Sequence, residues 1–140
     1  MSGAPREEEI RRMYAEYALL RRLAESLSRN IALLNNLIAD TRAAREVVAE
    51  VEKILDEQEL VVPIGGTLYL RTRYKQEKRV LTNVGSGVIV EKDYKEALEY
   101  LERRERMLEQ QLRKASADYR GVLARMQQIE QALAGLAGQE

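Results

Sequence analysis

The chain has 140 residues, a third of them charged, and its 23 Lys and Arg balance 23 Asp and Glu. Cys, His, Trp and Phe are missing. These gaps exclude disulfide scaffolds, zinc ribbons, thiol nucleophiles and Ser-His-Asp triads. The zero net charge argues against a nucleic-acid binder that works by bulk electrostatics. Because no stretch has the pattern of a signal peptide or membrane span, we expect a cytoplasmic protein without a membrane partner.

The first long segment predicts a coiled-coil helix over residues 6–58, because Gly and Pro are absent between Pro5 and Pro63. Apolar residues recur there at alternating spacings of three and four, the heptad pattern of a coiled coil. This seam consists of Ile10, Met13, Tyr17, Leu20, Ala24, Leu27, Ile31, Leu34, Ile38, Thr41, Ala44, Val48, Val51 and Leu55. Two consecutive steps of three, at Ile38–Thr41–Ala44, form a stammer that predicts local overwinding.

The middle segment, residues 60–92, predicts two β-hairpins in series. Four stretches rich in β-branched and aromatic residues, at 60–64, 67–74, 79–84 and 88–92, are typical of strands. Gly65-Gly66, the polar residues 75–78 and Gly85-Ser86-Gly87 supply the turns. The segment is basic, with six Lys and Arg against two acidic residues.

The last segment predicts a second coiled-coil helix over residues 93–138, with Asp93 and Glu96 placed as a capping box. Its seam alternates four and three without a break through Tyr94, Leu98, Leu101, Glu105, Leu108, Leu112, Ala115, Tyr119, Val122, Met126, Ile129, Leu133 and Leu136. Glu105 is the one charged member, and we expect it to set the register of the helix pair.

The two helices match in length, so they are expected to fold back as one antiparallel pair. The predicted fold class is therefore α+β and mainly α, a single unit over residues 1–140 with two hairpins between two helices. Four short strands cannot close a core of their own, so the hairpins are expected to complete a β-barrel shared between subunits. The residues expected to make this assembly are Val61, Val62, Ile64, Leu68, Leu70, Val80, Leu81, Val84, Val88 and Val90.

No enzyme chemistry is predicted. The Gly-rich stretch at 83–92 (NVGSGVIVEK) leads into a strand and lacks the Lys-Ser/Thr of a phosphate loop, so we expect no nucleotide and no other cofactor. No metal site is expected either. Arg71, Arg73 and Arg79 cluster near Tyr69 and Tyr74, which is a weak signal for single-stranded nucleic acid. Edge protection or pairing within an assembly is the favoured interpretation, so no nucleic-acid partner is expected.

The shared end of the two helices is unusually apolar, and after Glu130 the sequence has no charge until Glu140. The residues singled out there are Ile10, Met13, Tyr14, Tyr17, Met126, Ile129, Leu133 and Leu136. Because helix ends fray, these residues are expected to be partly accessible. They form either ordinary end-of-coil packing or an adaptable surface that repacks around different partners.

Local motifs coincide with this architecture. Residues 59–71 (ELVVPIGGTLYLR) and 80–101 (VLTNVGSGVIVEKDYKEALEYL) resemble the two hairpins of the alpha-class subunits of the archaeal-type prefoldin family. The resemblance covers the chain from about residue 8, with departures at Gly66-Thr67 and Thr82-Asn83.

The resemblance implies a hexamer of two alpha and four beta subunits with a double β-barrel body. It also implies an ATP-independent co-chaperone that holds unfolded proteins at its coiled-coil tips and delivers them to a group II chaperonin. The singled-out tip residues would then bind the client. The alternative is a structural coiled-coil adaptor that oligomerises through its hairpins and binds one folded partner.

Overall fold

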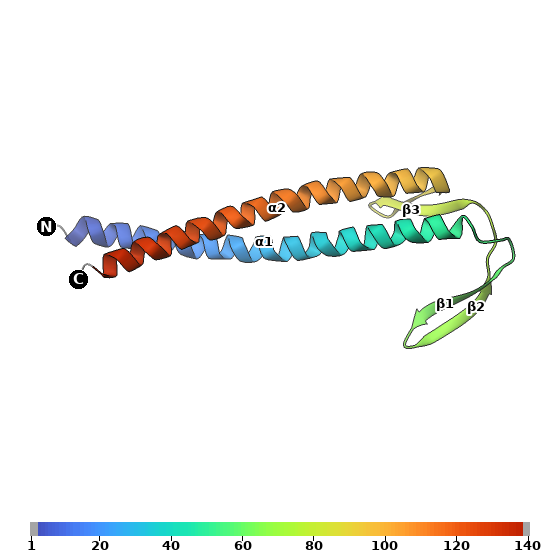
Figure 1. The fold of residues 1–140 in the computed structure, drawn as a ribbon, viewed down its shortest axis with the longest axis horizontal. Coiled ribbons are helices and arrows are strands. Elements are labelled where there is room, and N and C mark those ends of the chain that lie inside the picture. The colour runs from blue at the N-terminus through green and yellow to red at the C-terminus, as the bar shows by residue number, and fades with distance from the viewer. Residues whose placement is uncertain (1–2, 139–140) are drawn as a thin grey trace. The chain divides into compact units, whose positions relative to one another are not determined.

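The computed structural model describes residues 3–138 and contains two long helices with two β-hairpins between them (Figure 1). Helix α1 runs over Gly3–Val51 and helix α2 over Tyr94–Ala137. The chain divides into two compact units. Residues 3–38 and 107–138 form the helical unit, and residues 39–106 form the hairpin unit. The predicted fold class is confirmed in its order of elements, helix, two hairpins, helix.

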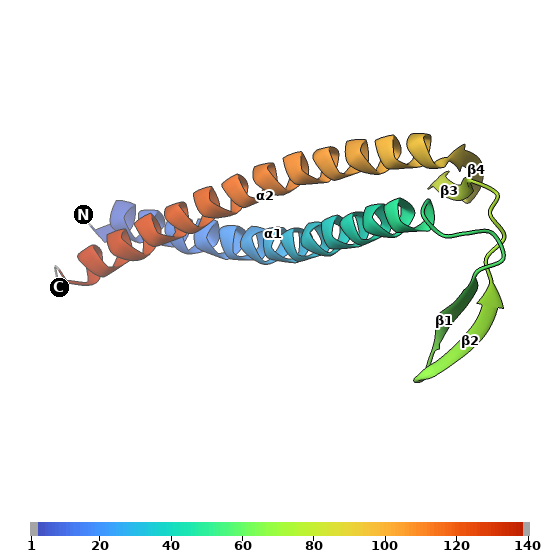
Figure 2. The same cartoon turned by 45° about the vertical axis from the view of Figure 1, so that its right-hand side comes forward.

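In the helical unit, α1 and α2 run antiparallel, and the described ends of the chain lie together (Figures 1 and 2). The buried cluster contains Leu34, Ile38, Leu108 and Ala115, and Leu27, Ile31, Leu37 and Leu112 pack against it. Every predicted seam residue of both helices is buried or half-buried except Leu55. The heptad pattern therefore located the inner face of both helices correctly, including the passage through Ile38, Thr41 and Ala44.

Helix α1 ends earlier than the predicted residue 58. The last helical residue is Val51, and the amides of Lys53 and Ile54 donate to the carbonyls three residues back, Glu50 and Val51, at 3.0 Å each. Glu57 then adopts φ 62° and redirects the chain into the first strand. Leu55, the last predicted seam residue, is 73% exposed because the helix no longer carries it.

The hairpin unit contains two separate two-stranded antiparallel sheets. Strand β1 (Glu59–Gly65) pairs with β2 (Leu68–Arg73), and β3 (Arg79–Gly85) pairs with β4 (Val88–Asp93). Each pairing shifts register before the turn, at Pro63/Gly65 and at Asn83/Gly85. In both turns the two central residues have positive φ, as type I′ hairpin turns require: Gly66-Thr67 in the first and Ser86-Gly87 in the second.

Hydrogen bonds tie the first hairpin to the chain that leads into it. The amide of Glu57 donates to the Tyr74 carbonyl at 2.8 Å, and the amide of Tyr74 donates to the Gln58 carbonyl at 2.9 Å. The amide of Gln76 donates to Asp56 Oδ1 at 2.9 Å. These bonds cross-link the connection before β1 to the connection after β2, and so brace the base of this hairpin. Among residues 3–138, no helix is long and apolar enough to cross a membrane.

Candidate binding and assembly surfaces

Polar contacts join the two helices near their shared end. Arg6 Nη2 donates to the Leu136 carbonyl at 2.6 Å, which satisfies a carbonyl that the end of α2 leaves without a partner. The Arg125 guanidinium donates to both carboxylate oxygens of Glu16, at 2.8 and 3.0 Å. This bidentate bond holds the pKa of Glu16 below its usual range.

The Tyr17 hydroxyl donates to Glu130 Oε1 at 2.6 Å, and this bond raises the pKa of Tyr17. The acidic side chain nearest the apolar end of α2 is thereby held against α1. Together with the Arg6 and Glu16 contacts, this bond restricts how far the helix ends can separate. The apolar residues at this end therefore lie on two helices that are held together by polar contacts.

The structure divides the predicted tip residues into three groups. Tyr14 is 60% exposed. Half-buried positions are held by Ile10, Met13, Tyr17, Met126, Leu133 and Leu136. Ile129 is the exception to the expected accessibility, because it is only 2% exposed and is the most enclosed large side chain described. The expectation of fraying was wrong for Ile129, since the polar contacts on either side of it keep the helices closed over this seam position.

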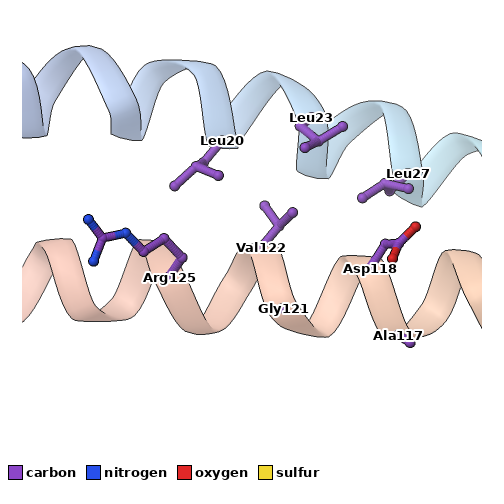
Figure 3. A pocket seen from close by; sticks show the side chains of 8 residues that line it. All are labelled: Leu20, Leu23, Leu27, Ala117, Asp118, Gly121, Val122 and Arg125. Atoms are coloured by element: carbon purple, nitrogen blue, oxygen red, sulfur yellow. The ribbon is translucent and has the colours of Figure 1, made fainter.

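Next to this end, the helical unit has a shallow apolar groove of about 420 Å³ between α1 and α2 (Figure 3). Leu20, Leu23 and Leu27 of α1 face Val122 of α2 across it, with Asp118 and Arg125 on the α2 side. Gly121 leaves open space, because an added Cβ would meet no atom within 4 Å. The α1 residue Leu19, outside the lining, is 65% exposed. The groove and its surroundings therefore present apolar surface to solvent.

The hairpin unit exposes apolar side chains on both sheets. Pairing places Leu60, Val62, Leu68 and Leu70 on one face of the first hairpin. In the second hairpin, Val80, Val88 and Val90 share a face with Thr82. Nine of the ten predicted assembly residues are exposed in the single chain, and the tenth, Val80, is half-buried.

The predicted assembly residues do not share one face of each hairpin. Val61 pairs with Arg71, on the opposite face from Val62, and Leu81 pairs with Glu91, on the opposite face from Val80. Ile64 and Val84 fall at the two register shifts. A spacing of two residues assigns faces within one strand, but a shift in register alters the assignment beyond it.

A buried charge lies in the seam of the hairpin unit. Glu105 is 7% exposed, and Arg42 Nε donates to its Oε1 at 2.7 Å. Arg45 Nη1 lies 2.8 Å from Oε2 in an ion pair that is not aligned as a hydrogen bond. The Arg42 hydrogen bond, assisted by the charges of both arginines, holds the pKa of Glu105 below its usual value of 4.5.

The start of α2 is anchored to the hairpins. Asp93 Oδ1 accepts a hydrogen bond from the Glu96 amide at 2.8 Å, which confirms the predicted capping position. The hydroxyls of Tyr74 and Tyr94 share a hydrogen bond. The pKa of Tyr94 is raised to about 12, mainly by burial of the side chain and secondly by this hydrogen bond. Lys92 Nζ lies 5.4 Å from the centre of the Tyr100 ring, within range of a cation–π contact.

Most of the chain is similar in sequence to known proteins. Residues 20–139 match the family model described as "Prefoldin subunit". The chain belongs to the prefoldin family. Its relatives include the prefoldin alpha subunit of Thermofilum pendens, 33% identical over 87% of this chain and 95% of the relative. A second is the alpha subunit of Archaeoglobus fulgidus, 30% identical over 91% and 93% of the two chains.

A solved structure supports the fold. The chain resembles a subunit in the cryo-EM structure of filamentous prefoldin from Methanocaldococcus jannaschii, with a TM-score of 0.70 and 21% identity over 86% of this chain and 97% of that one. The family match and the identity to archaeal prefoldin alpha subunits make the chain an alpha-class prefoldin subunit of archaeal type. Prefoldin subunits are non-enzymatic components of a hexameric chaperone, so its role is that of a chaperone cofactor that assembles with other prefoldin subunits.

Sequence reasoning missed the groove and the polar contacts beside it. Gly121 was the available signal, because an isolated Gly inside a helical pattern commonly has a packing or functional reason. The pairing of Glu16 with Arg125 joins residues 109 positions apart, and no local spacing indicates it.

Proposed function

We propose that this chain is the alpha subunit of a complex of two alpha and four beta subunits that holds unfolded proteins without ATP. In this proposal the hairpins join those of beta-class subunits in a shared β-barrel. The helical units capture unfolded polypeptides near their free ends and deliver them to a group II chaperonin.

The observation that carries the proposal is that apolar surface is exposed in both the hairpin unit and the helical unit, where the proposed function requires binding partners. In the hairpin unit, the valines and leucines predicted to make the assembly face solvent, except Val80, which is half-buried. Large exposed apolar patches mark interaction sites or aggregation hazards, and an edge strand of a two-stranded sheet invites pairing with another chain. Other subunits that cover these faces would bury the exposed apolar side chains and pair the free strand edges.

In the helical unit, Tyr14, Leu19 and Leu23 are exposed on α1, and Leu23 also lines the groove beside Val122. The helix pair already buries its own seam, so packing between α1 and α2 does not require these side chains. An open apolar surface without a deep pocket suits weak binding to many sequences, and several helical units in one complex would raise the avidity.

The test replaces exposed side chains and leaves the seam intact. The variant carries Tyr14→Ser, Leu19→Ser and Leu23→Ser, and the matched control carries Leu33→Ser and Val47→Ser, which are equally exposed but lie farther from the free ends. Each is assembled with its beta-class partners, and suppression of aggregation is measured after a test protein is diluted from denaturant. We expect at least a several-fold loss of suppression in the variant and little change in the control.

Equal suppression by the two variants would contradict capture at this surface. A native mass other than two alpha with four beta would contradict the stoichiometry. Saturable binding to one folded protein, with no effect on aggregation, would instead support the adaptor. Transfer is tested separately, by asking whether a group II chaperonin takes up the held test protein.

A further inference from the structure

We propose that Glu105, together with Arg42 and Arg45, fixes the register in which α1 and α2 pair. The three residues form a single charged layer in a seam that is otherwise apolar or uncharged. This role concerns how the helices align and does not depend on which client or partner the subunit binds.

Two arginine charges lie on either side of the Glu105 carboxylate. Arg42 Nε donates to Oε1 at 2.7 Å and Arg45 Nη1 lies 2.8 Å from Oε2, so each oxygen faces a different arginine. The side chains of Arg42 and Arg45 remain 54% and 39% exposed, whereas that of Glu105 is 10% exposed. Water can solvate the arginines in any alignment, but Glu105 depends on the protein for its partners.

Within the unbroken heptads on either side of the stammer, the repeat does not specify alignment, because a shift of seven residues again places seam against seam. Such a shift would slide one helix by about 10 Å at 1.5 Å per residue. In one direction, Asn35 and Ile38 would replace Arg42 and Arg45 at the level of Glu105. Residues 30–41 contain no Lys or Arg, so the carboxylate would be buried without a cation.

The opposite shift is unfavourable for a second reason. Ala49 and Glu52 would then replace Arg42 and Arg45, and Glu50 lies between them. Glu105 would meet Glu50 and Glu52, which lie at and just past the end of α1 and before Lys53, instead of two arginines, and like charges at close range repel. Both neighbouring registers are thus disfavoured by Glu105, while the apolar heptads away from the stammer would tolerate either one.

A buried charged layer of this kind favours one alignment without necessarily raising stability. Replacing a buried ion pair with apolar residues is often neutral or stabilising. Glu105→Leu therefore separates the two roles: the helix pair should keep or raise its melting temperature and lose its unique register. Glu99→Leu is the matched control, because it removes an exposed carboxylate from the same helix outside the seam.

The chain has no Cys, so spin labels can be attached at Ala43→Cys and Glu102→Cys, two exposed positions of the hairpin unit. Labelled full-length chain is diluted with unlabelled chain, so that the distance between labels is measured within one chain. We expect one distance in the otherwise unchanged chain and in Glu99→Leu, and a second population in Glu105→Leu. The charge-swapped variant Glu105→Arg, Arg42→Glu, Arg45→Glu should return to one distance.

A single unchanged distance in Glu105→Leu would overturn the proposal, whatever the melting temperature. So would two populations in the charge-swapped variant when its circular dichroism shows folded helices. If Glu105→Leu lowered the melting temperature and kept one distance, the layer would serve stability alone.

Discussion

The helical unit and the hairpin unit treat apolar residues in opposite ways. In the helical unit, the seam residues face each other and are buried or half-buried within one chain. In the hairpin unit, most strand valines and leucines face solvent, because each sheet has two strands and no layer packed over both faces. An antiparallel helix pair can complete its core alone, whereas an isolated two-stranded hairpin is at best marginally stable in water.

The largest expected effect concerns assembly through the hairpin unit. Val84→Asp or Val90→Asp places a charge where we expect another subunit to cover the strand, and a buried unpaired charge is strongly unfavourable. Since both residues are exposed in the single chain, the chain should still fold but the hexameric complex should not form. Native mass spectrometry measures the mass of the complex that forms.

The control for the assembly variants is Val47→Asp, which makes the same change at an exposed position of α1. It should leave the mass of the complex unchanged. A complex of normal mass from both Val84→Asp and Val90→Asp would show that these valines lie outside the subunit contacts.

A smaller effect is expected in the helical unit, where Ile129→Ala leaves a cavity at the most enclosed position. A buried Ile→Ala change destabilises by about 2–5 kcal/mol. Leu19→Ala, at an exposed position of the same unit, should cost less than about 0.5 kcal/mol. Chemical unfolding followed by circular dichroism compares them, and equal costs would show that Ile129 is not enclosed in solution.

The junction of the hairpins with α2 should respond to alkaline pH through Tyr94. Its pKa is raised from 10 to about 12 because the side chain is buried and its hydroxyl shares a hydrogen bond with the Tyr74 hydroxyl. A raised pKa stabilises the folded chain below pH 10, and that contribution is lost as the pH rises through about 12. Titration of tyrosinate absorbance should show a late-titrating group that is missing from Tyr94→Phe.

The smallest expected effect concerns the first turn, where Thr67 has φ 65°. A β-branched residue is unfavourable in this left-handed region, and Gly adopts it freely. Thr67→Gly should therefore stabilise the assembled complex by up to about 1 kcal/mol, because the gain in the turn is partly offset by the greater chain entropy of Gly. A lower melting temperature in this variant would contradict the turn geometry.

The sequence by itself determined the order of elements, the inner face of each helix and the positions of the turns. Periods of three-four and of two depend on local backbone geometry, so the spacing of Leu34, Ile38 and Leu108 or of Leu68 and Leu70 sufficed to assign faces. The capping position of Asp93 is local in the same sense. The end of α1 was predicted too late because the seam spacing continues to Leu55 beyond the last helical hydrogen bonds.

Only the tertiary structure decided which distant groups meet. The pairing of Glu105 with Arg42 and Arg45, the Glu16–Arg125 contact and the groove at Gly121 all depend on how two segments align across the chain. Burial followed the same rule, since Ile129 and Leu133 are successive members of one heptad seam, yet only Ile129 is enclosed. Enclosure is a property of both helices together, and a repeat within one helix does not encode it.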